Sequence, residues 1–407
     1  MKNVIVGQSG GPTAVINSSL LGVFKTAKDR GADKVYGMVH GIKGLLDRDV
    51  VDMSTQVKND LDMDLLKRTP SSFLGSCRYK LPSIEGNEAT YDKIFEILKE
   101  LDIFAFFYIG GNDSMDTIDK LSKYGQKIGS KIRFMGCPKT IDNDLAITDH
   151  TPGYGSAAKY IAATTKEIIR DGHVYDYPVV SVIEVMGRNA GWLTAAAALA
   201  KGEDCEGVDM IYLPERVFDI DKFLKDVGEK LKGNRSIVIA VSEGVKVADG
   251  RYVCELADHV DYVDAFGHKQ LAGTARFLAG KVAEKYGVKT RAIELSSLQR
   301  CAAHITSRID VTEAFNSAGA AVKAAFEGKT GMVACLKRVS EDPYMCITEL
   351  AEVSKIANVE KKVPDEWITP DGTYVTPELI HYIRPLIQSE ITPLWVDGLP
   401  RHLKLER

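Results

Sequence analysis

The sequence VIVGQSGGPTAVINSSLLGVFKTAK, residues 4–28, contains three patterns in direct succession. Val4-Ile5-Val6 is a short apolar run typical of a buried strand, and a glycine-rich turn extends from Gly7 to Gly11. Apolar residues then recur at helical spacing from about Ala14 to Lys28. The stretch therefore predicts a strand, a loop and a helix.

Similar units recur along the chain, because further apolar runs end at glycine-containing or polar loops. The expected strands are Phe104–Ile109, Ile132–Gly136, Val179–Val185 (followed by Gly187 and an alanine-rich helix) and Ile237–Val241. Apolar strands that alternate with helices predict mainly parallel sheets covered on both faces, hence an α/β fold. In such sheets the binding crevice lies beyond the carboxyl ends of the strands, where these loops fall.

Bulk composition excludes several classes of protein. The 407 residues carry a formal net charge of -4, which does not supply the broad basic field of a nucleic-acid binder. No apolar run reaches the roughly 18 residues that span a bilayer, and the N-terminus lacks a signal-type pattern. The seven cysteines form no CxxC pair and the eight histidines no HExxH, so we expect reduced thiols and no structural metal. These features predict a cytoplasmic protein that binds neither membranes nor nucleic acid.

Two glycine-containing loops are candidates for phosphate binding. The loop from Gly7 to Thr13 joins a strand to a helix, where backbone amides and the helix dipole can receive an anion. It lacks the spacing of a Walker A loop or of GxGxxG, so a plain structural turn is an equal reading. The second loop, Tyr108–Ser114, adds a polar pair and Ser114 as the expected N-cap of a helix. Anion or magnesium-phosphate binding is favoured there over capping alone.

The strongest chemical signal is Pro138-Lys139-Thr140-Ile141-Asp142-Asn143-Asp144, after the strand that ends near Gly136. Phosphoryl transfer to a hydroxyl needs a carboxylate to accept the proton and cations to neutralise the moving group. Asp142 and Asp144 could divide the base and support roles, and Lys139 supplies a fixed positive charge. Taken alone, an aspartate-rich turn after a strand is an equally good interpretation.

With its neighbours, this segment resembles the phosphofructokinase family, which carries a GGD-type loop, TIDND and MGR in this order. The resemblance covers about residues 3–320. Its other segments are Leu74–Arg78, Glu184–Gly191, Val241–Gly244, Arg291 and Leu298–Arg300. It implies two three-layer αβα domains, a homodimer or homotetramer, and Mg²⁺ as cofactor. A donor domain of residues 1–153 with about 299–330, a sugar-phosphate domain of 154–298 and an accessory region of 331–407 are expected.

The resemblance also implies which residues bind each substrate. The fructose 6-phosphate site would consist of Thr140, Ile141, Asp142, Met186, Gly187, Arg188, Glu243, Arg291, Ser297 and Arg300, with Asp142 as the general base. The donor phosphates would lie against Gly11, Arg78, Gly111 and Ser114. Arginines suit a dianionic phosphate through their forked donors, although Arg188 or Arg300 read alone would more often be a surface residue.

Two positions indicate the phosphoryl donor. ATP-using members usually carry glycine at both, whereas Asp113 and Lys139 resemble the pyrophosphate-using branch. An aspartate beside the donor pocket would repel and crowd the α-phosphate of a nucleotide, but the shorter pyrophosphate leaves that space free. Lys139 can stabilise a pyrophosphate oxygen as it leaves. Pyrophosphate is therefore the expected donor.

Three positions depart from the family pattern. Asn112 stands where many relatives have the aspartate associated with magnesium, and an amide holds a hard cation less strongly than a carboxylate. Magnesium could then be held largely by pyrophosphate and water, with Asn112 as the candidate protein ligand. Ser297 replaces a sugar-site histidine and Val179 an arginine of many ATP-dependent members. A seven-carbon sugar phosphate therefore stays open as an acceptor.

Two other functions remain in competition. An ATP-dependent phosphofructokinase or another sugar kinase of this fold is disfavoured by Asp113 and Lys139. A non-catalytic, sugar-phosphate-binding regulatory subunit is disfavoured because Asp142 and Asp144 are both present. In the final 80 residues we expect charged helices, with residues 382–387 forming a packed helix terminus.

Overall fold

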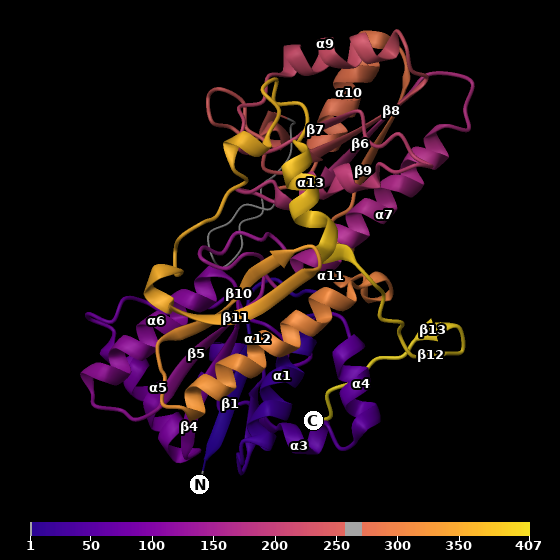
Figure 1. Cartoon of the computed structure of the whole chain (residues 1–407). Helices are drawn as coiled ribbons and strands as arrows, with labels where there is room; N and C mark the ends of the chain where they lie inside the picture. The colour runs from indigo at the N-terminus through magenta and orange to yellow at the C-terminus, as the bar shows by residue number, and fades with distance from the viewer. Residues whose placement is uncertain (1, 257–270) are drawn as a thin grey trace. The chain divides into compact units, whose positions relative to one another are not determined.

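The computed structural model describes residues 2–256 and 271–407, and its elements are labelled in Figure 1. The chain forms two compact units. Unit 1 comprises Met1–Ser156, Arg300–Glu360 and Ser389–Arg407, and unit 2 comprises Ala157–Gln299 and Lys361–Gln388. Among the residues described, no helix has the length and hydrophobicity that crossing a membrane requires.

Unit 1 is built on a seven-stranded sheet with the order β11-β10-β5-β4-β1-β2-β3. β1, β2, β4, β5 and β10 are parallel, and β3 and β11 are antiparallel strands at the two edges. The strands are β1 Asn3–Gln8, β2 Val35–Met38, β3 Val50–Asp52, β4 Ile103–Gly110, β5 Arg133–Pro138, β10 Met332–Glu341 and β11 Tyr344–Glu352.

Both faces of this sheet are buried, so the central strands are continuously apolar. On β1, Val4 and Val6 pack into a core shared with α1 and α12, whereas Ile5 packs into a core shared with α2, α5 and α6. The helices are α1 Ile16–Asp29, α2 Gly41–Leu46, α3 Met53–Gln56, α4 Asp60–Arg68, α5 Glu88–Glu100, α6 Asn112–Lys127 and α12 Arg308–Phe326. The unit is a three-layer αβα structure, as predicted.

Close helix packing explains one glycine in α1. A Cβ at Gly22 would lie 2.3 Å from the carbonyl oxygen of Phe315, so only glycine lets α1 and α12 approach this closely.

Unit 2 contains a four-stranded, fully parallel sheet with the order β7-β8-β6-β9. Its strands are β6 Val179–Val185, β7 Met210–Tyr212, β8 Ser236–Ser242 and β9 Lys289–Glu294. Its helices are α8 Trp192–Ala195, α9 Ile220–Leu231, α10 Thr274–Tyr286 and α13 Pro377–Ile383, with the 3-10 turns η1 Ala196–Ala200, η2 Val253–Leu256, η5 Asp365–Trp367 and η6 Arg384–Ile387. α7 Tyr154–Gly172 begins within the last residues of unit 1, and α11 Leu298–Cys301 spans a unit boundary.

The final 80 residues differ from the expected accessory region of charged helices. β10 and β11 form an antiparallel hairpin, and β10 extends the unit 1 sheet by pairing in parallel with β5. The first half of β10 is an apolar run that is largely buried, so it belongs to the main core. Residues 361–388 belong to unit 2 and residues 389–407 to unit 1, with short elements η3 Ala303–Ile305, η4 Val353–Lys355, β12 Trp395–Val396 and β13 Leu399–Pro400. The predicted helix terminus is present, since Tyr382 and Leu386 are buried.

Candidate active site

Three candidate loops of unit 1 meet at one edge of its sheet. β1, β4 and β5 are adjacent and parallel, so their carboxyl ends point the same way. Backbone hydrogen bonds join the loops that follow them: Ser9 N donates to Ile109 O (3.0 Å), and Lys139 N donates to Gly110 O (3.0 Å). The crevice expected from the sequence therefore collects the glycine loops and Lys139.

Lys139 is only 2 % exposed, and its ammonium group lies on the first glycine loop. The Nζ atom donates to the carbonyl oxygens of Ser9 (2.9 Å) and Gly11 (2.6 Å). Burial lowers the pKa of Lys139 from 10.5 to about 8; the charge of Asp142 opposes this shift, and that of Arg300 adds to it. A positive charge is thus fixed on the loop before any ligand binds.

The segment carrying Arg78 is attached to the same loop. Ser76 Oγ donates to Gly10 O (2.6 Å), and Gly10 N donates to Cys77 O (3.2 Å). Arg78 itself is exposed.

Arg300 belongs to unit 1 and lies against Gly11. A Cβ added to Gly11 would be 3.4 Å from an Arg300 guanidinium nitrogen. The structure therefore brings together, beside one loop, a residue expected at the sugar phosphate and one expected at the donor.

The second glycine loop differs from expectation at Ser114. Gly111 is the N-cap of α6, and Ser114 lies inside the first turn. Its hydroxyl is buried and hydrogen-bonded to that of Ser9, so Ser114 joins two loops rather than capping the helix. Asp113 stands in the first turn of α6 and is partly exposed, with Lys80 Nζ 3.8 Å from its carboxylate.

The TIDND loop is held by Asn143, to which the sequence assigned no role. Asn143 adopts a left-handed conformation (φ 55°), and its Oδ1 accepts from Thr151 N (3.0 Å). Thr151 Oγ1 in turn donates to Thr140 O (2.8 Å), and Asp142 N donates to Thr140 Oγ1 (3.1 Å). Asp142 and Asp144 therefore flank a residue whose side chain is hydrogen-bonded to the segment that follows the loop.

Asp144 lies in an environment that favours its protonated form. Burial, followed by the charges of Asp142 and Glu360, raises the pKa of Asp144 from 3.8 to about 7. Its Oδ2 is 3.5 Å from the side-chain amide of Asn112. That amide satisfies its hydrogen bonds when its nitrogen donates to the carbonyls of Ile356 (3.2 Å) and Val359 (3.3 Å), which turns its oxygen toward Asp144. A proton or a hard cation suits the space between these oxygens.

The predicted sugar-binding loops of unit 2 interlock with one another. Ser242 Oγ donates to Gly187 O (2.6 Å), and Gly187 N lies 3.4 Å from Glu243 Oε1. Gly187 has φ +133°, and a Cβ there would be 2.5 Å from the carbonyl oxygen of Ala190. The MGR turn consequently requires glycine and holds Glu243 beside the segment that carries Arg188.

Gln299 is a positioning residue that the sequence did not reveal. It is buried, and its Oε1 accepts from Met186 N (3.0 Å) while its Nε2 donates to Ser296 O (3.1 Å). It thus ties the segment containing Ser297, which is exposed, to the loop after β6. Gln299 lies in the segment Leu298–Arg300 that resembles the family, but a glutamine between an apolar residue and an arginine reads as surface, so no role was assigned to it.

Arg291 is not brought into this cluster of loops. It pairs with Ser181 in the middle of the β9–β6 ladder, before the carboxyl end of β9. Its guanidinium is paired with Asp171 and lies 5.2 Å from the ring centroid of Tyr175.

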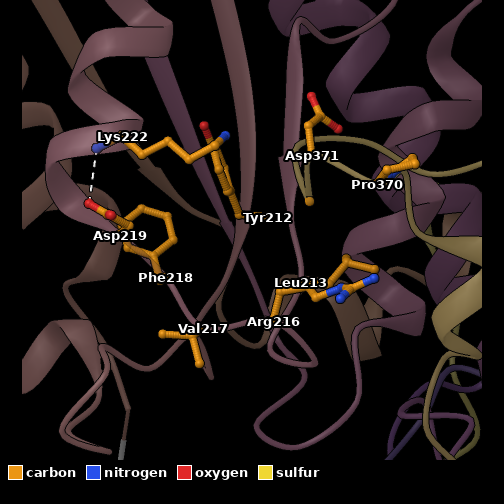
Figure 2. A pocket seen from close by; sticks show the side chains of 10 residues that line it. Tyr212, Leu213, Arg216, Val217, Phe218, Asp219, Lys222, Pro370 and Asp371 are labelled. Carbon is orange, nitrogen blue, oxygen red and sulfur yellow. Dashed lines mark hydrogen bonds between the residues drawn. The ribbon is translucent and has the colours of Figure 1, made fainter.

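A separate cavity of about 160 Å³ lies in unit 2 near the carboxyl end of β7. Figure 2 shows Arg216, Lys222 and Asp371 among the side chains around it, and the Lys222 amide bonded to Asp219, the N-cap of α9. None of the residues predicted for the substrates lines this cavity.

Comparison with known proteins gives consistent matches over most of the chain. Residues 3–325 match the family model described as Phosphofructokinase. A protein from Methylococcus capsulatus named pyrophosphate--fructose 6-phosphate 1-phosphotransferase is 41% identical over 99% of this chain and 96% of its own. A protein of the same name from Halomonas elongata is 39% identical over 100% and 96%. The crystal structure of a pyrophosphate-dependent phosphofructokinase from Nitrosospira multiformis has 38% identity and a TM-score of 0.90, covering 100% of this chain and 96% of that one.

Proposed function

The chain belongs to the phosphofructokinase family, and on that basis we infer that it transfers a phosphoryl group from pyrophosphate to fructose 6-phosphate, giving fructose 1,6-bisphosphate in a reversible reaction. Full-length similarity to proteins named for this reaction carries the conclusion. The buried ammonium of Lys139 on the first glycine loop is the structural feature that agrees best with a small, highly charged donor.

We propose that Asp142 is the general base. Its carboxylate would take the proton of the C1 hydroxyl as the sugar oxygen bonds to the transferred phosphorus and the bridging P–O bond of pyrophosphate breaks. Lys139 would stabilise the charge that develops on the departing phosphate, and its fixed position means that little reorganisation is needed. The anchored loop supports this assignment, because Asn143 and Thr140, on either side of the base, are both hydrogen-bonded to Thr151.

We propose Mg²⁺ as the cofactor, with Asn112 and Asp144 as the protein groups that would hold it. Their oxygens are hard ligands of the kind magnesium accepts, and a bound cation would neutralise phosphate charge during transfer. Gly11, Arg78, Gly111 and Ser114 remain the proposed contacts of the donor phosphates.

The acceptor residues proposed in unit 2 are Met186, Gly187, Arg188, Glu243 and Ser297, and those in unit 1 are Thr140, Ile141 and Arg300. The interlocked loops support the former set, since they hold Arg188 and Glu243 together. Arg291 is proposed to act on the sugar phosphate of a neighbouring subunit, because it lies on the edge strand of the unit 2 sheet. A homodimer or homotetramer follows from this proposal, and light scattering of the purified protein measures the subunit number. We propose the cytoplasm as its compartment.

The decisive experiment assays the purified chain with fructose 6-phosphate and either pyrophosphate or ATP, with and without magnesium. We expect magnesium-dependent formation of fructose 1,6-bisphosphate with pyrophosphate. A parallel assay with a seven-carbon sugar phosphate measures the acceptor range. A preference for ATP would favour the nucleotide-dependent kinase, and no turnover with either donor would favour the regulatory subunit.

Asp142→Asn is the matched inactive variant for this assay. It removes the base but keeps the size of the side chain, so kcat should fall by at least about 10²-fold. Circular dichroism and melting temperature should match the wild type. Near-normal turnover by the folded variant would exclude Asp142 as the base.

A further inference from the structure

His150 lies in residues 139–156, the segment that begins with the proposed catalytic residues and is called the arm below. It stands six positions after Asp144 and is 1 % exposed. Its Nδ1 is 2.8 Å from Asp149 Oδ1, and its Nε2 is 2.7 Å from Glu313 Oε2 on α12. Because a carboxylate oxygen faces each ring nitrogen, both nitrogens must carry a hydrogen to make these bonds. The ring is therefore an imidazolium held between two carboxylates.

The surrounding charges keep this ring protonated at neutral pH. Burial lowers the pKa of His150, but the charge of Glu313 and the hydrogen bonds of Asp149 and Glu313 raise it by more than burial lowers it. The net result is a pKa raised from 6.5 to about 9. On β10, Arg338 pairs with Asp149 (3.1 Å) and also with Glu341 (3.0 Å).

β11 supplies two further polar groups beside His150 and its partner Glu313. Tyr344 donates its hydroxyl to the second oxygen of Glu313 (2.7 Å). Cys346 lies nearby, and burial followed by the charge of Glu313 raises the pKa of its thiol to about 12.

A bound cation is the alternative explanation of this cluster. The ligand atoms of His150, Glu313 and Cys346 lie within 4.8 Å of one another, and zinc accepts this combination of ligands. A metal would have to displace both the proton that bridges His150 to Glu313 and the proton of a thiol with a pKa of about 12. The hydrogen-bond geometry favours the proton as the bridge.

The hydrogen bonds of His150 to Asp149 and Glu313, called the clamp below, are connected to the proposed base through the neighbouring residue Thr151. Thr151 contacts Asn143 and Thr140, which set the backbone around Asp142. The same arm is bound to α12 a second time.

In this second attachment, Gly153 N and Ser156 N each donate to the carboxylate of Asp310 at 2.8 Å. Asp310 is one turn from Glu313, so two carboxylates of a single helix hold the arm.

We propose that His150 is a positioning residue for phosphoryl transfer, whose imidazolium fastens the arm after TIDND to Glu313 and so fixes the geometry of Asp142. The proposal rests on the function inferred above. It follows physically because a reacting group displaced by about 1 Å can lose up to about 10²-fold in rate.

The test compares His150→Gln with the wild type and with His173→Gln, an exposed histidine of unit 2. We expect kcat with pyrophosphate to fall at least about 10-fold in His150→Gln. The KM for fructose 6-phosphate should change less than about 3-fold, because the Arg188 and Glu243 loops are held by hydrogen bonds of unit 2. His173→Gln should behave as the wild type.

A second variant separates positioning from folding. Glu313→Gln keeps the shape of the partner but removes its charge, and it should lose kcat in the same direction. Because both variants break one bond, the double variant should lose less than the product of the two single losses. If His150→Gln does not fold, Glu313→Gln carries the same test. A lowered melting temperature with unchanged kcat would reduce His150 to a structural residue and overturn the proposal.

The pH dependence of stability tests the clamp without any activity assay. The folded-state pKa of about 9 exceeds the unfolded value of 6.5, so this stabilisation is complete below 6.5 and is lost as pH rises to about 9. The melting-temperature difference between wild type and His150→Gln should shrink over this interval. This measurement remains valid if the wild type shows no pyrophosphate activity, an outcome that would reject the proposed function instead.

A melting temperature raised by zinc chloride in the wild type but not in Cys346→Ser would show a cation in place of the proton.

Discussion

Lys139 shows how one buried residue can make a reaction depend on pH. Burial lowers its pKa to about 8, and only the protonated amine can neutralise a departing phosphate. We expect kcat/KM for pyrophosphate to fall as pH rises through about 8, approaching tenfold per pH unit. Bound pyrophosphate adds negative charge beside the amine, so the corresponding limb of kcat should lie at higher pH.

Lys139→Gly is the control for this profile. Its turnover should be about 10²-fold lower and should lack the alkaline limb near pH 8. Persistence of that limb in the variant would assign it to another group.

Asp113 is the residue at which donor choice should change. If Asp113 lies beside the donor as the family resemblance implies, Asp113→Gly removes a negative charge and a side chain from the space that the α-phosphate of a nucleotide would need. We therefore expect ATP to begin to react while pyrophosphate kinetics change only modestly. Steady-state kinetics with both donors for Asp113→Gly, Lys139→Gly and the double variant measure the coupling. The two effects should be non-additive because both residues are proposed to contact one donor. If Asp113→Gly shows no reaction with ATP, the role given to Asp113 is contradicted.

At the scale of elements, strands were the best-predicted features. Buried parallel strands are continuous apolar runs, so Val179–Val185 was predicted with the bounds that β6 has. β10 was missed because its second half alternates exposed and half-buried residues, including Lys337 and Arg338, and its apolar first half is short. Pairing with β5, which lies about 200 positions earlier in the sequence, made it a strand of the main sheet.

The part of the candidate site that could be predicted consists of polar and charged residues in loops directly after apolar strands. Lys139 and the glycine loops do converge, because neighbouring parallel strands bring their carboxyl ends together. Asn143, Gln299 and Asp310 were not predicted, since a polar residue that will be buried against a backbone amide looks the same in sequence as one in water. Ser114 was placed at the wrong helix position because its partner, Ser9, lies on another strand's loop.

The turn after β6 provides a prediction at this scale. Gly187 has φ +133°, and a Cβ there would approach the Ala190 carbonyl to 2.5 Å. Gly187→Ala should therefore displace Glu243 and weaken the saturation by fructose 6-phosphate, with a loss of about 1–3 kcal/mol in stability. Acceptor kinetics and thermal unfolding measure both effects. Gly250→Ala, also at positive φ but with open space around it, is the control for strain alone.

For the whole molecule, the main surprise is how often the chain passes from one unit to the other. It does so after Ser156, Gln299, Glu360 and Gln388. The predicted donor domain already returned once, at about residues 299–330, but the later passages after Glu360 and Gln388 were not predicted, because a strand added late by long-range pairing leaves no local signal.

The late arrival of β10 has a consequence for the protein while it is being made. When β5 leaves the ribosome, five of the seven strands of its sheet exist, but the edge of β5 that β10 will cover is still unpaired. About 190 more residues must be translated before β10 appears, which at typical rates of about 5–20 residues per second takes roughly 10–40 s. An open, apolar strand edge is a template for pairing with the wrong chain. Newly made chains should therefore depend on chaperones during this interval more than the finished protein does.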